Sequence, residues 1–108
     1  MASELSKAAN DVLAERQRQV EAEGWTPEHD DAHSDGELGR AAAVYALLGC
    51  LPEEFALSAY IRSQFPMLWP WDAEDMKLSP ARRSLVKAAA LILAEIERLD
   101  RQEATRGQ

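Results

Sequence analysis

The ten residues from 28 to 37, EHDDAHSDGE, contain both histidines of the chain and five carboxylates. His29 and His33 are four residues apart, so one helical turn would place both imidazoles on the same face. Imidazoles combined with carboxylates suit Zn, Mn, Fe or Ni, whereas carboxylates alone suit Mg or Ca. The segment is therefore a candidate divalent-metal site, with ligands drawn from His29, Asp30, His33, Asp35 and Glu37.

Two other interpretations of this segment stay open. Asp and Ser side chains often cap helices, so the segment can be a solvated acidic loop between two helices. It can also be a charged surface that contacts a basic partner. The spacing matches neither the HExxH motif nor an EF-hand loop, so the pattern alone does not select a metal site.

A second group of carboxylates lies in AEIERLD, residues 94 to 100. Glu97 and Asp100 fall beside the apolar seam of a predicted helix, where a carboxylate can point into a cleft between helices. They could complete a metal site there. The alternative is an ion pair with Arg16 or Arg18, as carboxylates at the border of a helix usually make.

A basic cluster stands at the start of the same helix, in SPARRSLVK. Arg82, Arg83 and Lys87 lie where free backbone N–H groups and the positive end of the helix dipole can hold a phosphate. The alternative is that they pair with carboxylates just upstream, namely Asp72, Glu74 and Asp75.

The segment FPMLWPWD contains two tryptophans and cannot form a regular helix, because Pro66 and Pro70 disfavour helical geometry in the residues before them. We expect an extended connection that lies over the helices. Trp69 and Trp71 then either cover the core or offer a stacking face to a ligand.

The net charge of −7 comes from one region of this 108-residue chain. Residues 21 to 37 hold seven carboxylates and no Lys or Arg, and the remaining twelve acidic and twelve basic residues balance. The acidic region should repel nucleic-acid backbones, so no direct DNA or RNA binding is expected through it. No apolar run is long enough to span a bilayer. The single cysteine and the absence of a signal-like start suggest the cytoplasm.

Helical periodicity then defines the elements that must position these residues. The first helix should carry apolar residues from Leu5 to Val20, with Ser3 as its cap. It should end at Gly24, and Trp25 should either pack over the end of the helix or offer its ring for a ligand to stack on. Thr26 and Pro27 can start one short turn. Ser34 and Glu37 have the form of a capping box, which predicts a helix from about residue 35 to 48, ended by Gly49 and Pro52. A further short helix can start at Pro52.

The last helix is predicted from Ser79–Pro80 to about Glu103, with a seam of heptad-like spacing. The seam consists of Leu85, Ala89, Ile92, Ile96 and Leu99, and Val86, Ala88 and Leu93 widen it. Together these elements predict an all-α fold: a compact bundle of three main antiparallel helices, one short helix and a Pro/Trp-rich extended connection. We expect a single domain over residues 1–104 and a frayed tail over 105–108.

The blocks ERQRQVEAEGWTPEHDDAHSDGELGRAAAVYAL, WPWD and LVKAAALILAEIERLDR resemble a family of small, mostly uncharacterised proteins of bacteriophages and prophages. The resemblance covers about residues 13 to 101. It implies an accessory role in the cytoplasm of a bacterial host.

A looser similarity is to the all-α MazG-like pyrophosphohydrolases, which hold Mg with an EExxE helix and an ExxD helix. Glu97 and Asp100 match the ExxD spacing. The chain has no EExxE, and Glu37 is followed three residues later by Arg40 instead of a carboxylate.

Three functions follow as hypotheses. The first is a non-catalytic binding module, expected to be a homo-oligomer, for a nucleotide-like ligand or a host protein, for example in counter-defence. The second is a metal-dependent nucleoside-phosphate hydrolase, in which the metal would activate water. The third is an acidic protein that masks a basic surface of a host factor.

Overall fold

The computed structural model describes residues 4–51, 68–72 and 75–106, and every regular element of these residues is a helix. The fold is therefore all-α, as predicted. The main helices and the short one are α1 (Lys7–Glu23), α2 (Pro27–Asp31), α3 (Glu37–Cys50) and α5 (Ala81–Arg106). No helix among the described residues is both long enough and apolar enough to cross a bilayer.

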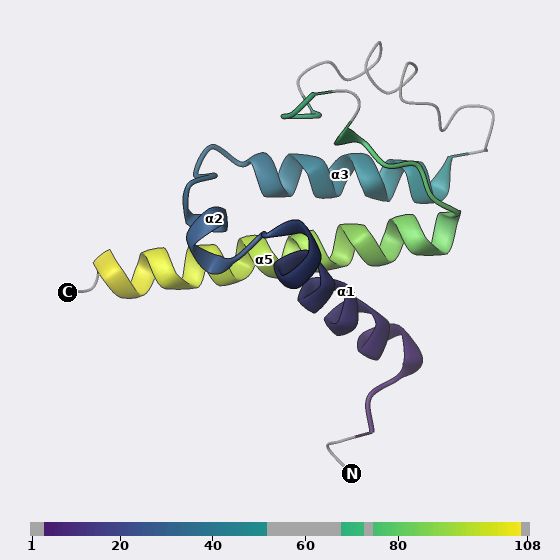
Figure 1. Cartoon of the computed structure of the whole chain (residues 1–108), viewed down its shortest axis with the longest axis horizontal. Helices are drawn as coiled ribbons and strands as arrows, with labels where there is room; N and C mark the ends of the chain where they lie inside the picture. The colour runs from purple at the N-terminus through teal and green to yellow at the C-terminus, as the bar shows by residue number, and fades with distance from the viewer. Residues whose placement is uncertain (1–3, 52–67, 73–74, 107–108) are drawn as a thin grey trace.

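The core lies between α3 and α5, which run antiparallel side by side (Figure 1). α1 crosses α5 obliquely, so its N-terminal half projects from the body, and the short α2 packs against α5 (Figure 1). The side chains that fill the core are mostly from α3 and α5, with Trp69 and Met76 added from the connection. They are Leu38, Ala41, Ala42, Val44, Tyr45, Leu48, Trp69, Met76, Ala88, Leu91 and Ala94.

The turn between α1 and α2 is built as predicted. Gly24 ends α1 in the left-handed region with φ 74°, which glycine adopts without strain. The backbone N–H of Trp25 donates to the carbonyl of Gln19 at 3.0 Å, the long hydrogen bond of a Schellman ending. The Thr26 hydroxyl then accepts from the N–H of His29, with Pro27 as the first residue of α2. The cap of α1 is Ser6 rather than Ser3.

The boundaries of α3 differ from the prediction. Its cap is Gly36, with φ 84° and no side-chain hydrogen bond, so the predicted capping by Ser34 is wrong. Glu37 instead accepts from the N–H of Asp35 at 2.7 Å and stabilises the turn before the helix. Gly49 does not end α3 either. A Cβ at this position would lie 2.6 Å from Cγ of Leu85, so the glycine lets α3 and α5 approach closely. The short helix expected from Pro52 lies outside the described residues.

The large residues of the predicted apolar seam of α5 lie at the surface, whereas Val86 and Ala88, which were predicted to widen it, are buried. Leu85, Ile92, Ile96 and Leu99 are 46–49% exposed. The buried face of α5 is rich in small residues instead: Ser84, Val86, Ala88, Ala90, Leu91, Ala94 and Arg98. Small side chains let neighbouring helices approach closely, and Leu91 fills the remaining space. α5 also continues to Arg106, beyond the expected end near Glu103.

Candidate ligand-binding site

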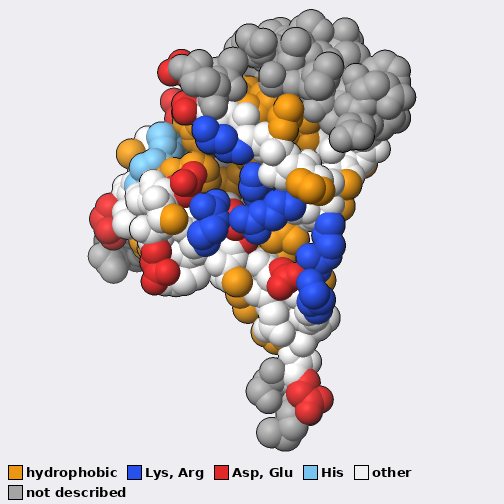
Figure 2. Space-filling model, turned by 45° about the vertical axis from the view of Figure 1, so that its right-hand side comes forward, with side chains coloured by type: hydrophobic (Ala, Val, Ile, Leu, Met, Phe, Trp, Pro, Cys, Tyr) orange, Lys and Arg blue, Asp and Glu red, His pale blue; other side chains and the backbone are white. Residues whose placement is uncertain are grey.

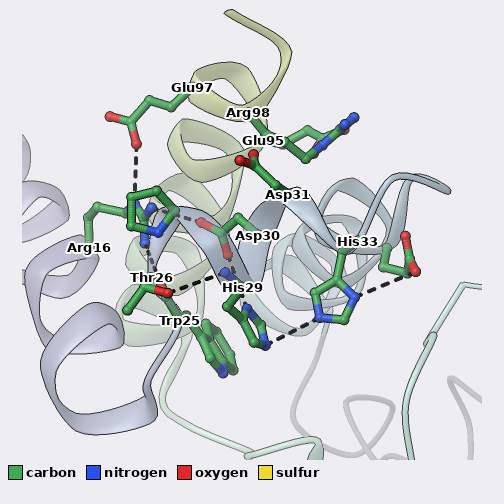
Figure 3. Close-up of polar contacts among 12 residues, drawn as sticks. Arg16, Trp25, Thr26, His29, Asp30, Asp31, His33, Glu95, Glu97 and Arg98 are labelled. Atoms are coloured by element: carbon green, nitrogen blue, oxygen red, sulfur yellow. Dashed lines mark hydrogen bonds and ion pairs between the residues drawn. The ribbon is translucent and has the colours of Figure 1, made fainter. Parts of the chain in front are cut away.

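A buried ion pair fixes α2 against α1 and so positions both histidines. Arg16 Nη2 lies 2.8 Å from Oδ2 of Asp30, whose side chain is fully buried. The same guanidinium donates to the carbonyl of Trp25 at 3.2 Å and to Glu97 Oε1 at 3.4 Å (Figure 3). Arg16 therefore joins α1, the turn before α2, α2 itself and α5.

The imidazoles of His29 and His33 extend this series of polar contacts from Asp30 toward solvent. Asp30 Oδ1 lies 3.3 Å from Nδ1 of His29, and Nε2 of His29 lies 3.3 Å from Nε2 of His33 (Figure 3). On its other side, His33 Nδ1 is 3.6 Å from Oε2 of Glu37. Of the two Nε2 atoms, one must be the donor and the other the acceptor. These contacts, from Asp30 through the two histidines to Glu37, orient both imidazole rings.

The candidate metal ligands are only partly brought together. His29, Asp30, His33 and Glu37 form the chain of contacts just described, but both oxygens of Asp30 are already engaged. Glu97 pairs with Arg16, and Asp100 is exposed on α5. Asp35 lies at the exposed turn before α3. Among the described residues, no three His, Cys, Asp or Glu side chains are grouped so that they could hold one ion.

An aromatic pocket opens beside the histidines, with a volume of about 380 Å³. Its walls are aromatic rings together with two carboxylates and one ammonium group. The lining residues are Trp25, His29, His33, Trp69, Trp71, Glu23, Asp75 and Lys77.

Trp71 lies at the centre of the aromatic contacts. Its ring centroid is 5.4 Å from that of Trp69, 5.8 Å from His33 and 6.0 Å from Trp25. The Trp25 and His29 rings are nearly parallel, with an interplanar angle of 8°. Residues from the α1–α2 turn, α2 and the Pro/Trp connection thus form one aromatic wall, and Trp71 is a half-exposed part of it.

Trp69 is both a core residue and a wall of this pocket. It is buried, its indole N–H donates to the carbonyl of Asp72 at 2.8 Å, and its ring meets Tyr45 edge to face. Because the indole N–H is satisfied and the ring is packed on the core, Trp69 is held in place before any ligand arrives. The interpretation of Trp69 as a residue that covers the core is therefore confirmed, and the stacking face for a ligand stays a prediction.

The arginines at the start of α5 face α1. Arg82 Nη1 lies 2.9 Å from Oδ2 of Asp11, and Arg83 pairs with Glu15. Within the described part of the chain, neither arginine pairs with the upstream carboxylates Asp72 and Asp75, so that expectation is wrong; Glu74 lies outside the described residues. The four residues of these two pairs line part of a hollow of about 450 Å³ between α1 and α5.

Glu15 is the centre of this second cluster. Its buried carboxylate accepts two hydrogen bonds from Arg18, at 2.8 and 2.9 Å, one from Gln19 at 3.1 Å and another from Arg83. Burial raises the pKa of Glu15, but the hydrogen bonds and positive charges of Arg18 and Arg83 outweigh it and hold the pKa below its ordinary value of 4.5.

We expect acid to destabilise the fold partly through Glu15. Because the folded-state pKa is lowered, Glu15 contributes stability above pH 4.5, and this contribution is lost as the pH falls through the lower folded-state value. The midpoint of urea unfolding should therefore decrease over that acidic range. In Glu15→Gln, the decrease should be smaller than in the parent protein. The control, Glu21→Gln, changes an exposed carboxylate and should keep the parent profile; an unchanged profile in Glu15→Gln would contradict the assignment.

Lys87 lies between the two hollows. Its ammonium donates to the Ser79 hydroxyl at 2.7 Å and sits 5.4 Å from the centroid of the Tyr45 ring. Burial, with the nearby charge of Arg83, lowers the pKa of Lys87. The third basic residue of the predicted phosphate site is therefore about one helical turn from Arg83, but it lines a small hollow together with Tyr45 and Lys77.

A smaller hollow, of about 40 Å³, lies between the two sites. It shares Glu15 and Arg18 with the hollow between α1 and α5, and shares four residues with the aromatic pocket. The four are Glu23, Trp25, Asp75 and Lys77. Lys87 also lines it. Lys and Arg side chains accordingly gather on one face, near the two histidines (Figure 2).

Comparison with protein-family models, curated proteins and solved structures finds no match to this chain. The interpretation of the site therefore rests on its own geometry.

Several residues of this site were not predicted as ligand contacts. Arg18 and Lys77 line the small hollow between the two sites, and Tyr45 supports both Trp69 and Lys87. The signal in the sequence was Arg16, a charged residue at helical spacing with the apolar residues of the predicted first helix. A charged residue in this position indicates a buried polar contact, but it does not identify the partner.

Proposed function

We propose that this chain is a non-catalytic binding module for a nucleotide-like small molecule. The ring of the ligand would enter the aromatic pocket, and its phosphate groups would contact the neighbouring Lys and Arg side chains. From the resemblance to phage and prophage proteins, we further propose that the chain acts in the cytoplasm of a bacterial host.

One observation carries the proposal: the aromatic pocket shares four lining residues with a small hollow of about 40 Å³ that Arg18, Lys77 and Lys87 also line, so aromatic faces and cations lie in adjoining hollows. The small hollow also has Trp25 and Tyr45 in its lining. A nucleotide has a flat ring that can stack on aromatic side chains, and a sugar joins this ring to phosphates that can pair with cations. Adjoining hollows that offer aromatic faces and cations complement such a ligand.

The aromatic end can recognise a base by stacking. Trp71 is only half-buried and its neighbours are packed, so a ring can lie against it with little rearrangement. Stacking of a base on an aromatic side chain contributes about 1–3 kcal/mol. The carboxylates of Glu23 and Asp75 in the pocket wall can accept hydrogen bonds from the amino groups of a base.

The basic end suits phosphate because one of its cations is partly desolvated. Burial lowers the pKa of Lys87, which means that its charged form has lost favourable hydration. A phosphate would restore a favourable partner for this charge. Arg18 adds a planar guanidinium that is 42% exposed, although Glu15 already holds one of its edges.

Isothermal titration with a panel of linear and cyclic nucleotides, nucleosides and inorganic phosphate tests the proposal. At least one nucleotide should bind, and more tightly than its nucleoside or phosphate alone. Trp71→Ala should weaken binding about 10- to 100-fold, as expected for the loss of one stacking contact. Lys87→Gln should also weaken binding to the nucleotide but should leave binding of the nucleoside unchanged.

Lys7→Gln is the matched control, because Lys7 is exposed on the projecting end of α1 and should not affect binding. Chromatography of each nucleotide after incubation with the protein and Mg or Mn should recover it intact. Absence of binding across the panel would remove the proposal, and conversion of a nucleotide would favour the hydrolase instead.

A further inference from the structure

α5 carries a row of apolar side chains that are exposed and that the other described helices do not cover. Leu85, Ile92, Ile96 and Leu99 are 46, 47, 49 and 46% exposed, with Ala89 between them. We refer to these five residues as the α5 seam. They follow one another at alternating steps of four and three residues, over about 21 Å of helix.

The seam lies between the faces of α5 that pack in the core. At about 100° per residue, the seam residues fall within one narrow arc of the helix, and the buried residues occupy the rest. These include Val86 and Ala90 on one side and Leu91 and Arg98 on the other. α1 and α3 pack on α5 and leave the seam exposed, apart from the contact of Leu85 with Gly49 of α3. A contiguous apolar row of this kind marks an interaction surface.

The spacing of the seam fits another helix. Alternating steps of three and four keep apolar residues on the line where two helices touch, and each side chain can then insert between residues of the facing helix. A small ligand or an extended peptide would not require a straight row of this length. The seam is therefore shaped for a long helix with the same apolar repeat.

The charges at the two ends of the seam indicate which helix this is. Arg82 continues the seam at its N-terminal end and stays 56% exposed despite its contact with Asp11. Asp100 and Glu103 lie at the C-terminal end, and neither forms an ion pair with another described residue. A second α5 in antiparallel orientation would place Arg82 of each copy near Asp100 and Glu103 of the other. A parallel copy would instead bring like charges together.

We propose that a second copy of this chain packs on the α5 seam, with the two α5 helices antiparallel. Ile92 and Ile96 lie near the middle of the contact, and the Leu85 end of each helix lies beside the Leu99 end of the other. The aromatic pocket involves none of the seam residues. The dimer and the proposed ligand binding can therefore be tested separately.

Sedimentation equilibrium of the full chain over a range of concentrations tests the contact. The mass should reach twice that of the 12.0 kDa chain. Ile92→Glu and Ile96→Glu should each raise the dimer Kd by about 100-fold or more, because each places two charges in the contact. Leu78→Glu is the control: Leu78 is equally exposed, at 52%, but lies outside the seam, so this variant should dimerise like the parent.

Circular dichroism must show unchanged helix content in these variants; Leu99→Lys provides a second seam variant if one of them unfolds. A monomer at all concentrations, or a dimer that the folded seam variants do not weaken, overturns the proposal.

Charge reversal tests the orientation of the two α5 helices. Arg82→Glu alone, and Asp100→Arg with Glu103→Arg, should each weaken the dimer, and the triple variant should restore it. Failure of the triple variant to restore the dimer rules out the antiparallel arrangement.

Discussion

Asp30→Ala is expected to lower the free energy of unfolding by about 3–5 kcal/mol, the range for breaking a buried ion pair by removing one partner. Asp30 is fully buried, and Arg16, whose side chain is 10% exposed, would keep its charge without its closest carboxylate. Glu97 would remain, but at 3.4 Å and on a side chain that is 52% exposed, so it cannot replace Asp30. Because Asp30 also contacts His29, the aromatic pocket should be disturbed as well.

Urea unfolding of Asp30→Ala and Asp31→Ala measures this effect. Asp31 is the adjacent residue on α2, but its side chain is 50% exposed and its pair with Arg101 lies at the surface. Its replacement should cost less than about 1 kcal/mol. Equal losses in the two variants would show that the Arg16–Asp30 pair does not hold α2 in place. In a double-mutant cycle, replacing Arg16 in the Asp30→Ala protein should cost less than in the parent, because the unpaired charge is then gone.

Leu91→Ala should lower the free energy of unfolding by about 2–5 kcal/mol, the range for removing a large aliphatic side chain from a packed core. Leu91 is fully buried and belongs to the core cluster between α3 and α5. Its neighbours on this face of α5 are small, with Ala88 and Ala94 nearby, so there are few side chains that could move to fill the cavity. The loss should therefore fall in the upper part of this range.

Leu78→Ala is the matched control, since it removes the same atoms from a residue that is 52% exposed. It should change the unfolding free energy by less than about 1 kcal/mol, as expected of a surface substitution. Both variants can be compared by urea unfolding at a single protein concentration, which keeps any contribution from association the same. A smaller loss for Leu91→Ala than for Leu78→Ala would mean that α5 is turned differently about its axis.

Much of the fold followed from local patterns in the sequence. The all-α class, the end of α1 at Gly24 and the start of α2 at Thr26 and Pro27 were predicted and are confirmed. These features depend on hydrogen bonds between residues that are only a few positions apart, so the sequence contains both partners within one short window. The start of α3 was wrong, because Gly36 and Ser34 are both plausible caps and the choice depends on how the turn before the helix packs.

The candidate site was predicted in its parts and not in its arrangement. His29, His33, Trp69 and Trp71 were recognised as residues that could bind something, and they line one pocket. That this pocket adjoins a small hollow lined by Arg18, Lys77 and Lys87 could not be read from the sequence. The residues involved come from distant segments, and their contacts exist only after those segments pack.

By itself, the sequence determined that helices form and where α1 and α2 meet, because short-range hydrogen bonds and helical periodicity decide those features. Only the tertiary structure decided which face of α5 is buried. The large residues at heptad spacing were expected in the core, but α3 and α1 pack against the alanine-rich face with Leu91, leaving Leu85, Ile92, Ile96 and Leu99 exposed. The physical reason is that periodicity identifies apolar faces, whereas burial depends on how closely another helix can approach each face.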